Sequence, residues 1–272
     1  MTTAVLYYKT PDGRVVPIVS GATGPAGPAG PAGADGAPGA TGPAGPPGSG
    51  GSKSLDDLTT FNDIYGTSPT GWDYEFDGLG TSLPAGWTIY NQDTGYGNIT
   101  YSEQAGRGIA SLRYTPGESL QPIVQSLSGA PTKWVAVGKC GFSPTDNRWA
   151  RSGICIRQNG GPPYGGPLVQ IGLANNNNRG NIHLNKWSDW RTFSANIREV
   201  DFSYPIGGTY FKIQKNSDTS YDFYVSSDGA GWQDWSLGYD PGFVPDQVGW
   251  LVGGQDNYTD ATIDWFRLRS VA

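Results

Sequence analysis

The side chains of this chain that could do chemistry are tryptophans in close pairs, a run of asparagines and a few scattered carboxylates. Sugars are typically held by an aromatic ring, on which the sugar ring packs, and by amide groups that bond its hydroxyls. The residues that fit this pattern are Trp187, Trp190, Trp232, Trp235, Asn176 and Asn177. A second interpretation stays open for each tryptophan, because large aromatic side chains also fill hydrophobic cores.

The carboxylates give no sign of a catalytic site. Glycosidases need two carboxyl groups, which lie about 5 Å apart in retaining enzymes. Glu75 and Asp77 are two residues apart and so share a strand face, but they belong to the opening segment of their region. His183 is the only histidine, and no Ser-His-Asp set, metal cluster or phosphate-binding loop can be built from the sequence. We therefore predict a protein that is not an enzyme.

Composition excludes several kinds of partner. The chain has 18 Lys and Arg against 24 Asp and Glu, a net charge of −6, which argues against nucleic acid as a partner. No run of about 18 apolar residues exists, so no membrane span is expected. The opening MTTAVLYYKTPDGR lacks the basic region and apolar core of a signal peptide. For Cys140 and Cys155 the sequence leaves open a disulfide or two buried thiols.

Ten Gly-x-y triplets run without interruption from residue 21 to residue 50. Glycine at every third position, with proline dense between, is typical of a collagen triple helix, because only glycine fits at its crowded axis. The axial glycines are Gly21, Gly24, Gly27, Gly30, Gly33, Gly36, Gly39, Gly42, Gly45 and Gly48. A triple helix needs two more chains, so we predict a homotrimer with a rod about 90 Å long. A flexible linker would not keep this period.

The regions beside the rod differ in pattern. Residues 1–20 contain two β-rich runs around an Asp-Gly turn, which predict a hairpin that anchors the chain to a larger assembly. A small cap on the rod is the alternative. The rod itself takes residues 21–51. Residues 72–272 alternate with period two in many short runs separated by turn residues, which indicates an antiparallel β-sandwich or jelly roll.

Between rod and sandwich, residues 52–71 form a linking region. Apolar residues recur there at near-helical spacing, between a start signal at Ser54 and a stop at Gly66, and predict a short helix over residues 54–65. Its apolar stripe consists of Leu55, Leu58 and Phe61. We expect this stripe to join three copies in a neck, and the alternative is that the helix packs on its own domain.

Three segments of the last region resemble the concanavalin A-like family, which includes lectins, laminarinase-type glucanases and non-catalytic relatives. The opening segment of that family resembles Phe76-Asp77-Gly78 together with Thr81–Trp87. A late hairpin of the family resembles Tyr221–Gly229 with Trp232, and its last strand resembles Ala261–Arg267. The resemblance implies an all-β, concanavalin A-like jelly roll. It also implies a structural calcium ion where the first and last strands meet, at Asp264, Phe76 and Gly78. The alternative is an Asp264 that faces solvent.

The whole layout resembles minor tail or fibre proteins of tailed bacteriophages, particularly those of actinobacteria. In these a short N-terminal segment precedes collagen-like triplets and a β-rich C-terminal domain, as MTTAVLYYKTPDGRVVPIVSGATGPAGPAG begins here. The resemblance implies a homotrimeric virion fibre, assembled in the host cytoplasm, that contacts other virion proteins through residues 1–20 and a host cell-surface glycan through the sandwich. Alternatives are a decoration fibre on the head, a secreted bacterial collagen-like adhesin and a cell-wall glycosidase.

Overall fold

The computed structural model describes residues 7–9, 15–17, 54–67, 72–76, 81–90, 98–103, 108–113, 119–143, 150–160, 165–176, 179–189, 192–201, 208–254 and 259–271. The chain divides into two compact units, Met1–Gly50 and Gly51–Ala272. In the first unit, strands β1 (Tyr7–Lys9) and β2 (Val15–Pro17) pair antiparallel, which confirms the predicted hairpin. The glycine triplets, and with them the predicted triple helix, lie outside the described residues.

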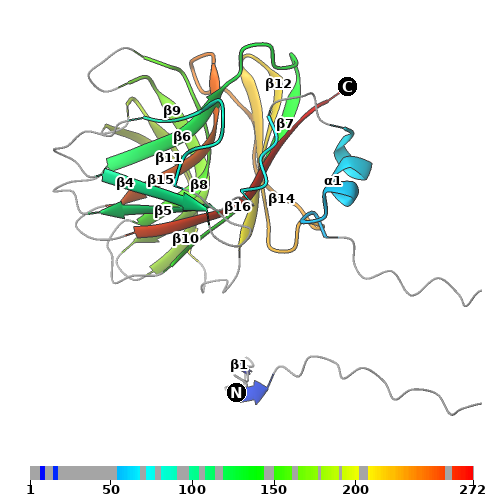
Figure 1. Ribbon diagram of the computed structural model, residues 1–272, viewed down its shortest axis with the longest axis vertical. Coiled ribbons are helices and arrows are strands. Elements are labelled where there is room, and N and C mark those ends of the chain that lie inside the picture. The colour runs from blue at the N-terminus through cyan, green and yellow to red at the C-terminus, as the bar shows by residue number, and fades with distance from the viewer. Residues whose placement is uncertain are drawn as a thin grey trace, which may run out of the picture. The chain divides into compact units, whose positions relative to one another are not determined.

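The second unit is a sandwich of two seven-stranded sheets (Figure 1). Sheet I contains, in spatial order, β14 (Gln233–Tyr239), β13 (Ser220–Ser226), β12 (Thr209–Ser217), β7 (Trp134–Ser143), β16 (Thr259–Ser270), β5 (Gly108–Arg113) and β4 (Asn98–Glu103). Sheet II contains β11 (Phe193–Asp201), β10 (Arg179–Trp187), β9 (Leu168–Asn176), β8 (Ala150–Arg157), β15 (Gln247–Gly254), β6 (Ser119–Ser126) and β3 (Trp87–Ile89). All neighbouring strands are antiparallel, which confirms the predicted all-β sandwich.

The main hydrophobic core lies between the sheets and takes side chains from alternate positions of each strand. In β8, Ile154 and Ile156 point into it, and Trp134 enters from β7. Gly138 lies on the same face of β7 as Trp134. A Cβ atom at this position would lie 2.8 Å from Ile154 Cγ2. A glycine at this position therefore lets the two sheets approach closely.

The two cysteines are free and buried. Cys140 faces the core between the sheets, whereas Cys155 faces the other way on sheet II. Burial raises the pKa of the Cys155 thiol to about 12 and raises that of Cys140 well above its usual value. The cysteines are thus two small buried thiols and not a disulfide.

Each sheet also has an outer face, turned away from the core between the sheets. Helix α1 (Leu58–Tyr65) lies on the outer face of sheet I (Figure 1). The Asp57 carboxylate caps its first turn by accepting from the backbone N–H of Thr60 at 2.7 Å, and Gly66 ends it with φ 84°. The predicted short helix is therefore confirmed, although it begins at Leu58 and not at residue 54. No helix among the described residues is long and apolar enough to cross a membrane.

The packing of α1 corrects the expected role of its apolar stripe. Leu55 and Phe61 are 2% and 0% exposed, and they form one cluster with Val135 and Trp265 of the same chain. Side chains buried in their own chain cannot join other copies in a neck. Leu58, by contrast, is 41% exposed. The helix and the segment before it therefore pack on their own domain, because sheet I offers Leu55 and Phe61 an apolar surface.

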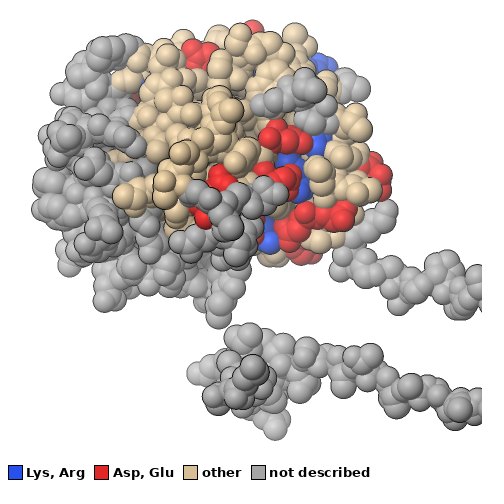
Figure 2. Space-filling view, in the orientation of Figure 1, with Lys and Arg blue, Asp and Glu red and all other residues tan. Residues whose placement is uncertain are grey.

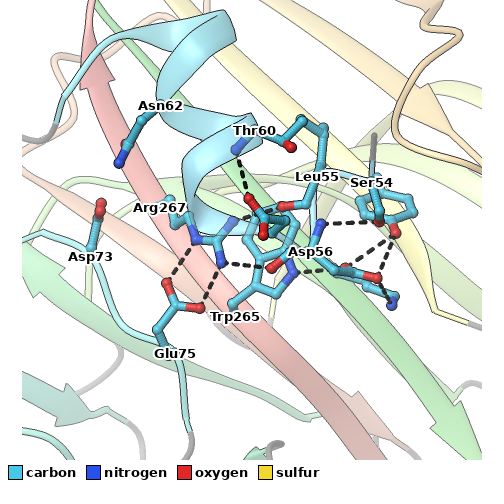
Figure 3. Close-up of polar contacts among 12 residues, drawn as sticks. Ser54, Leu55, Asp56, Thr60, Asn62, Asp73, Glu75, Trp265 and Arg267 are labelled. Atoms are coloured by element: carbon cyan, nitrogen blue, oxygen red, sulfur yellow. Dashed lines mark hydrogen bonds and ion pairs between the residues drawn. The ribbon is translucent and has the colours of Figure 1, made fainter. Parts of the chain in front are cut away.

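A buried arginine fixes the segment before α1 to sheet I (Figure 3). Arg267 of β16, 1% exposed, donates to the carbonyl oxygens of Leu55 (2.7 Å) and Asp56 (3.2 Å) and pairs with Glu75 at 2.6 Å. The Asp56 carboxylate in turn accepts from the indole N–H of Trp265 at 2.9 Å. Figure 2 shows carboxylates and a few basic side chains gathered on the same side of the molecule as α1. The chain thus enters the sandwich along the outer face of sheet I.

Candidate functional site

The structure places two of the predicted aromatic platform residues inside the protein. Trp187 is 0% exposed, with the Arg151 guanidinium 5.3 Å and the Phe193 ring 5.2 Å from its own ring. Trp235 is 6% exposed in the core between the sheets, with the Arg198 guanidinium 4.5 Å from its ring. Neither ring offers an open face to a sugar, so the expected stacking role is corrected for both.

Of the other predicted platform residues, the structure describes the side chain of Trp232. Trp232 is half-buried beside α1, and Lys212 Nζ lies 4.5 Å from the centre of its ring. Asn176 is the last residue of β9, but its side chain is not among those described. Trp190 and Asn177 lie outside the described residues. The predicted set is therefore divided, with Trp187 on sheet II and Trp232 on the opposite side of the sandwich.

The described residues at the expected calcium position show no metal site. Asp264 pairs with Lys139 at 3.2 Å, and the same ammonium group also pairs with Asp56 at 2.8 Å. Phe76 is fully buried, and Gly78 lies outside the described residues. Calcium takes six to eight oxygen ligands, and the described part of the chain has no group of three or more His, Cys, Asp or Glu side chains able to hold a metal.

A different cluster of side chains lies on the outer face of sheet II. Its members come from three neighbouring strands, and none is more than 5% exposed. This polar cluster consists of Arg151, Gln170, Asn181, His183, Asn185 and Trp187. The four members on β10 alternate with Ile182 and Leu184, which pack against the core between the sheets. Strand periodicity therefore puts all four on the outer face.

Strand register brings the cluster together. Asn185 of β10 lies opposite Gln170 of β9, and His183, two residues before Asn185, lies opposite Gly172. Gly153 of β8 follows in the same row, opposite Gly172. A Cβ atom on Gly153 would lie 2.5 Å from Gly172 Cα, so these strands meet closely and only glycine is accommodated. The two positions in line with His183 across the sheet, one on β9 and one on β8, are therefore glycines without side chains.

Hydrogen bonds run through the cluster from β8 to β11. Arg151 Nη1 donates to His183 Nδ1 at 3.4 Å and to Asn185 Oδ1 at 2.9 Å. Asn185 Nδ2 donates to Asn196 Oδ1 of β11, and Asn196 Nδ2 donates to Glu199 Oε2. Arg151, His183 and Asn185 are therefore held in fixed orientations by one another.

Several buried polar atoms of the cluster nevertheless have no hydrogen-bond partner among the residues that the structure describes. They are both amide atoms of Gln170, Asn181 Oδ1, His183 Nε2 and Trp187 Nε1. Because an arginine can only donate, His183 Nδ1 is the acceptor, and the proton of the neutral ring lies on Nε2. Each unsatisfied buried group costs about 1–3 kcal/mol. The unsatisfied groups of the cluster thus include both donors and acceptors.

Electrostatics keep this histidine in the form that the network requires. Burial, together with the positive charge of Arg151, holds the pKa of His183 well below its usual value. The ring is thus neutral near pH 7. A neutral ring can accept from Arg151 at Nδ1 and still donate from Nε2 to a ligand.

The sequence contains a signal for this cluster. Asn181-x-His183-x-Asn185-x-Trp187 places polar or hydrogen-bonding side chains at every second position of one strand. A prediction based on tryptophan rings finds only Trp187 in it, and assigns that residue to stacking rather than to hydrogen bonding. Gln170 belongs to another strand and is brought beside Asn185 only by the register of the sheet.

Comparison with known proteins shows the fold. No family model and no curated protein matches the chain. A functionally unknown protein from Saccharomyces cerevisiae is similar in structure, with a TM-score of 0.53, 11% identity, and 69% of this chain and 98% of that chain covered. An engineered GH43 glycoside hydrolase with endo-xylanase and exo-arabinofuranosidase activity has a TM-score of 0.52 and 14% identity, over 73% of this chain.

This chain spans 40% of the length of that hydrolase. The CBM2 module of the evolved Dit protein of Lactobacillus casei BL23 phage J-1 has a TM-score of 0.45 and 12% identity, with 74% of this chain and 96% of that module covered. At such identities the yeast protein and the hydrolase show a shared β-sandwich and nothing about activity.

Proposed function

We propose that the sandwich binds a glycan through the polar cluster on the outer face of sheet II. The observation that carries this proposal is the set of buried, unpartnered polar atoms at Gln170, Asn181, His183 and Trp187. Sugar hydroxyls donate and accept at the same oxygen, so a glycan can satisfy amide, imidazole and indole groups together. Hydrogen bonds to Arg151 and to Glu199 hold His183 and Asn181 in place before a ligand arrives.

The position of the cluster supports a role in recognition. The chain enters the sandwich on the outer face of sheet I, where Arg267 holds Leu55 and Asp56. The polar cluster occupies the outer face of sheet II. The two sheets pack face to face, so the cluster lies on the side of the sandwich away from this point of entry.

The same proposal extends to the whole chain as a homotrimeric virion fibre. The glycine triplets at residues 21–50 need three chains, and residues 1–20 would bind other virion proteins. Three linked sandwiches would raise the avidity of weak sites by roughly 10²–10⁴ on a repetitive glycan. A decoration fibre would share this layout but lack glycan binding, and an adhesin would bind without being part of a particle.

The test compares glycan binding by the full chain with that of two variants. Gln170→Leu removes an amide without a partner and keeps a similar volume, so the melting temperature should stay equal or rise, while glycan binding falls at least about tenfold. Tyr221→Phe is the matched control, because the Tyr221 hydroxyl is also buried and unpartnered but belongs to sheet I. It should leave binding unchanged.

Glycan arrays and isolated bacterial cell envelopes provide the ligands, and reducing-sugar release is measured in parallel. Unchanged binding by Gln170→Leu, together with a higher melting temperature, would show that the cluster only stabilises the sheet. No binding by any form of the trimer would favour the decoration fibre. Release of reducing sugars by the parent chain would contradict a protein that only binds.

A further inference from the structure

A carboxylate lies directly beside the unpartnered groups. Glu199 of β11 is the cross-strand partner of His183, and side chains paired in this way have Cβ atoms about 4.5–5.5 Å apart. Glu199 is exposed, whereas His183 is 1% exposed. Any ligand that bonds His183 Nε2 must therefore come close to the Glu199 carboxylate.

The carboxylate is fixed in this position by two amides. Glu199 Oε1 accepts from Asn181 Nδ2, and Glu199 Oε2 accepts from Asn196 Nδ2. Both amides thereby turn their N–H groups toward the carboxylate. Asn181 Oδ1 points elsewhere and has no partner. The β11 side of the cluster is therefore rich in acceptors.

The unpartnered atoms divide into two chemical types. Gln170 Nε2, His183 Nε2 and Trp187 Nε1 carry hydrogens that need an acceptor. Gln170 Oε1 and Asn181 Oδ1 need a donor. A hydroxyl group supplies both. An ionised carboxylate, sulfate or phosphate supplies acceptors only, leaves the two amide oxygens unsatisfied, and meets the negative charge of Glu199. The positive charge of Arg151 is already engaged with His183 and Asn185.

We infer that the polar cluster selects neutral, hydroxyl-rich glycans, and that Glu199 is the residue that excludes acidic ones. This inference rests on the proposed function and adds the chemical class of its ligand. Repulsion between like charges acts in addition to the unsatisfied amide oxygens, so an acidic sugar should bind at least about tenfold more weakly than its neutral counterpart.

The experiment measures the ratio of affinities of the full chain for paired probes. Each pair consists of a neutral oligosaccharide that the parent chain binds and its uronic acid counterpart, in which a carboxylate replaces a primary hydroxyl. Glu199→Gln removes the charge and retains an oxygen and a nitrogen at the same place. Asp218→Asn, in the turn between β12 and β13 of sheet I, is the control for the same change in net charge. All measurements are made at low and at high salt.

The parent chain and Asp218→Asn should prefer the neutral probe at least about tenfold, and Glu199→Gln should reduce this preference several-fold by gaining affinity for the acidic probe. High salt should weaken the preference in the parent chain. Equal or tighter binding of acidic probes by the parent chain, or an unchanged ratio in Glu199→Gln, would overturn the inference.

These outcomes are distinct from failure of the proposed function. If glycans bind, and Gln170→Leu abolishes that binding, the site is established whatever the ratio is. If the ratio then does not depend on Glu199, only the selectivity is wrong. If no glycan binds the parent chain, or if Gln170→Leu does not change glycan binding, both the proposed function and the proposed selectivity are wrong.

Discussion

Arg267 Nη2 and Glu75 Oε2 lie 2.6 Å apart and join β16, the C-terminal strand, to the segment that leads into the sandwich (Figure 3). The Arg267 side chain is 1% exposed and the Glu75 side chain 35% exposed, so the guanidinium is shielded from solvent and the carboxylate is partly exposed to it. Removing the Glu75 carboxylate leaves the buried Arg267 guanidinium without one of its acceptors.

Glu75→Ala should therefore lower the free energy of unfolding by about 1–3 kcal/mol, measured by denaturant unfolding of the full chain. Asp218→Asn is the control, because Asp218 is 64% exposed and pairs with Lys215 only at the surface. Its effect should be about 0.5 kcal/mol or less. Equal effects of the two changes would show that Arg267 does not depend on Glu75.

Phe61→Ala should destabilise the sandwich by about 3–5 kcal/mol, because the removed ring is 0% exposed. Leu58→Ala, at a position that is 41% exposed, should cost less than about 1 kcal/mol. Light scattering should show that neither change alters the association state. A Phe61→Ala protein that unfolds normally but dissociates would instead support the neck.

Stability should fall as pH is lowered from about 7 toward 5. The pKa of His183 is held below its unfolded value near 6.5, so the unfolded chain binds a proton that the folded chain does not, and folding loses up to about 1.4 kcal/mol per pH unit there. His183 is the only histidine. His183→Gln should therefore remove this slope in a series of denaturant melts, and a slope that persists would assign it to carboxylates.

Gly33→Ala should loosen the predicted triple helix, because no side chain fits at the collagen axis. Circular dichroism melting and protease resistance of residues 21–50 in the full chain provide the measurement. Ala32→Ser, at a position off the axis, is the matched control and should melt like the parent chain. Equal melting of all three proteins would contradict the triple helix.

Period-two patterning predicted the all-β sandwich, since a strand that buries one face must alternate whatever its neighbours are. The Asp-Gly turn predicted the β1–β2 hairpin, and the spacing from Ser54 to Gly66 predicted α1, because turns and caps depend on local geometry. The glycine triplets likewise form a local pattern, so they predict three chains without any knowledge of tertiary contacts.

The candidate site was decided by tertiary structure. Burial depends on what packs against a ring, so the sequence could not distinguish Trp187 and Trp235, which are buried, from an exposed platform. The side on which Leu55 and Phe61 bury depended on an apolar surface formed by three strands of sheet I. Gln170 and Glu199 flank β10 only because strand register places one opposite Asn185 and the other opposite His183, and register is a property of the assembled sheet.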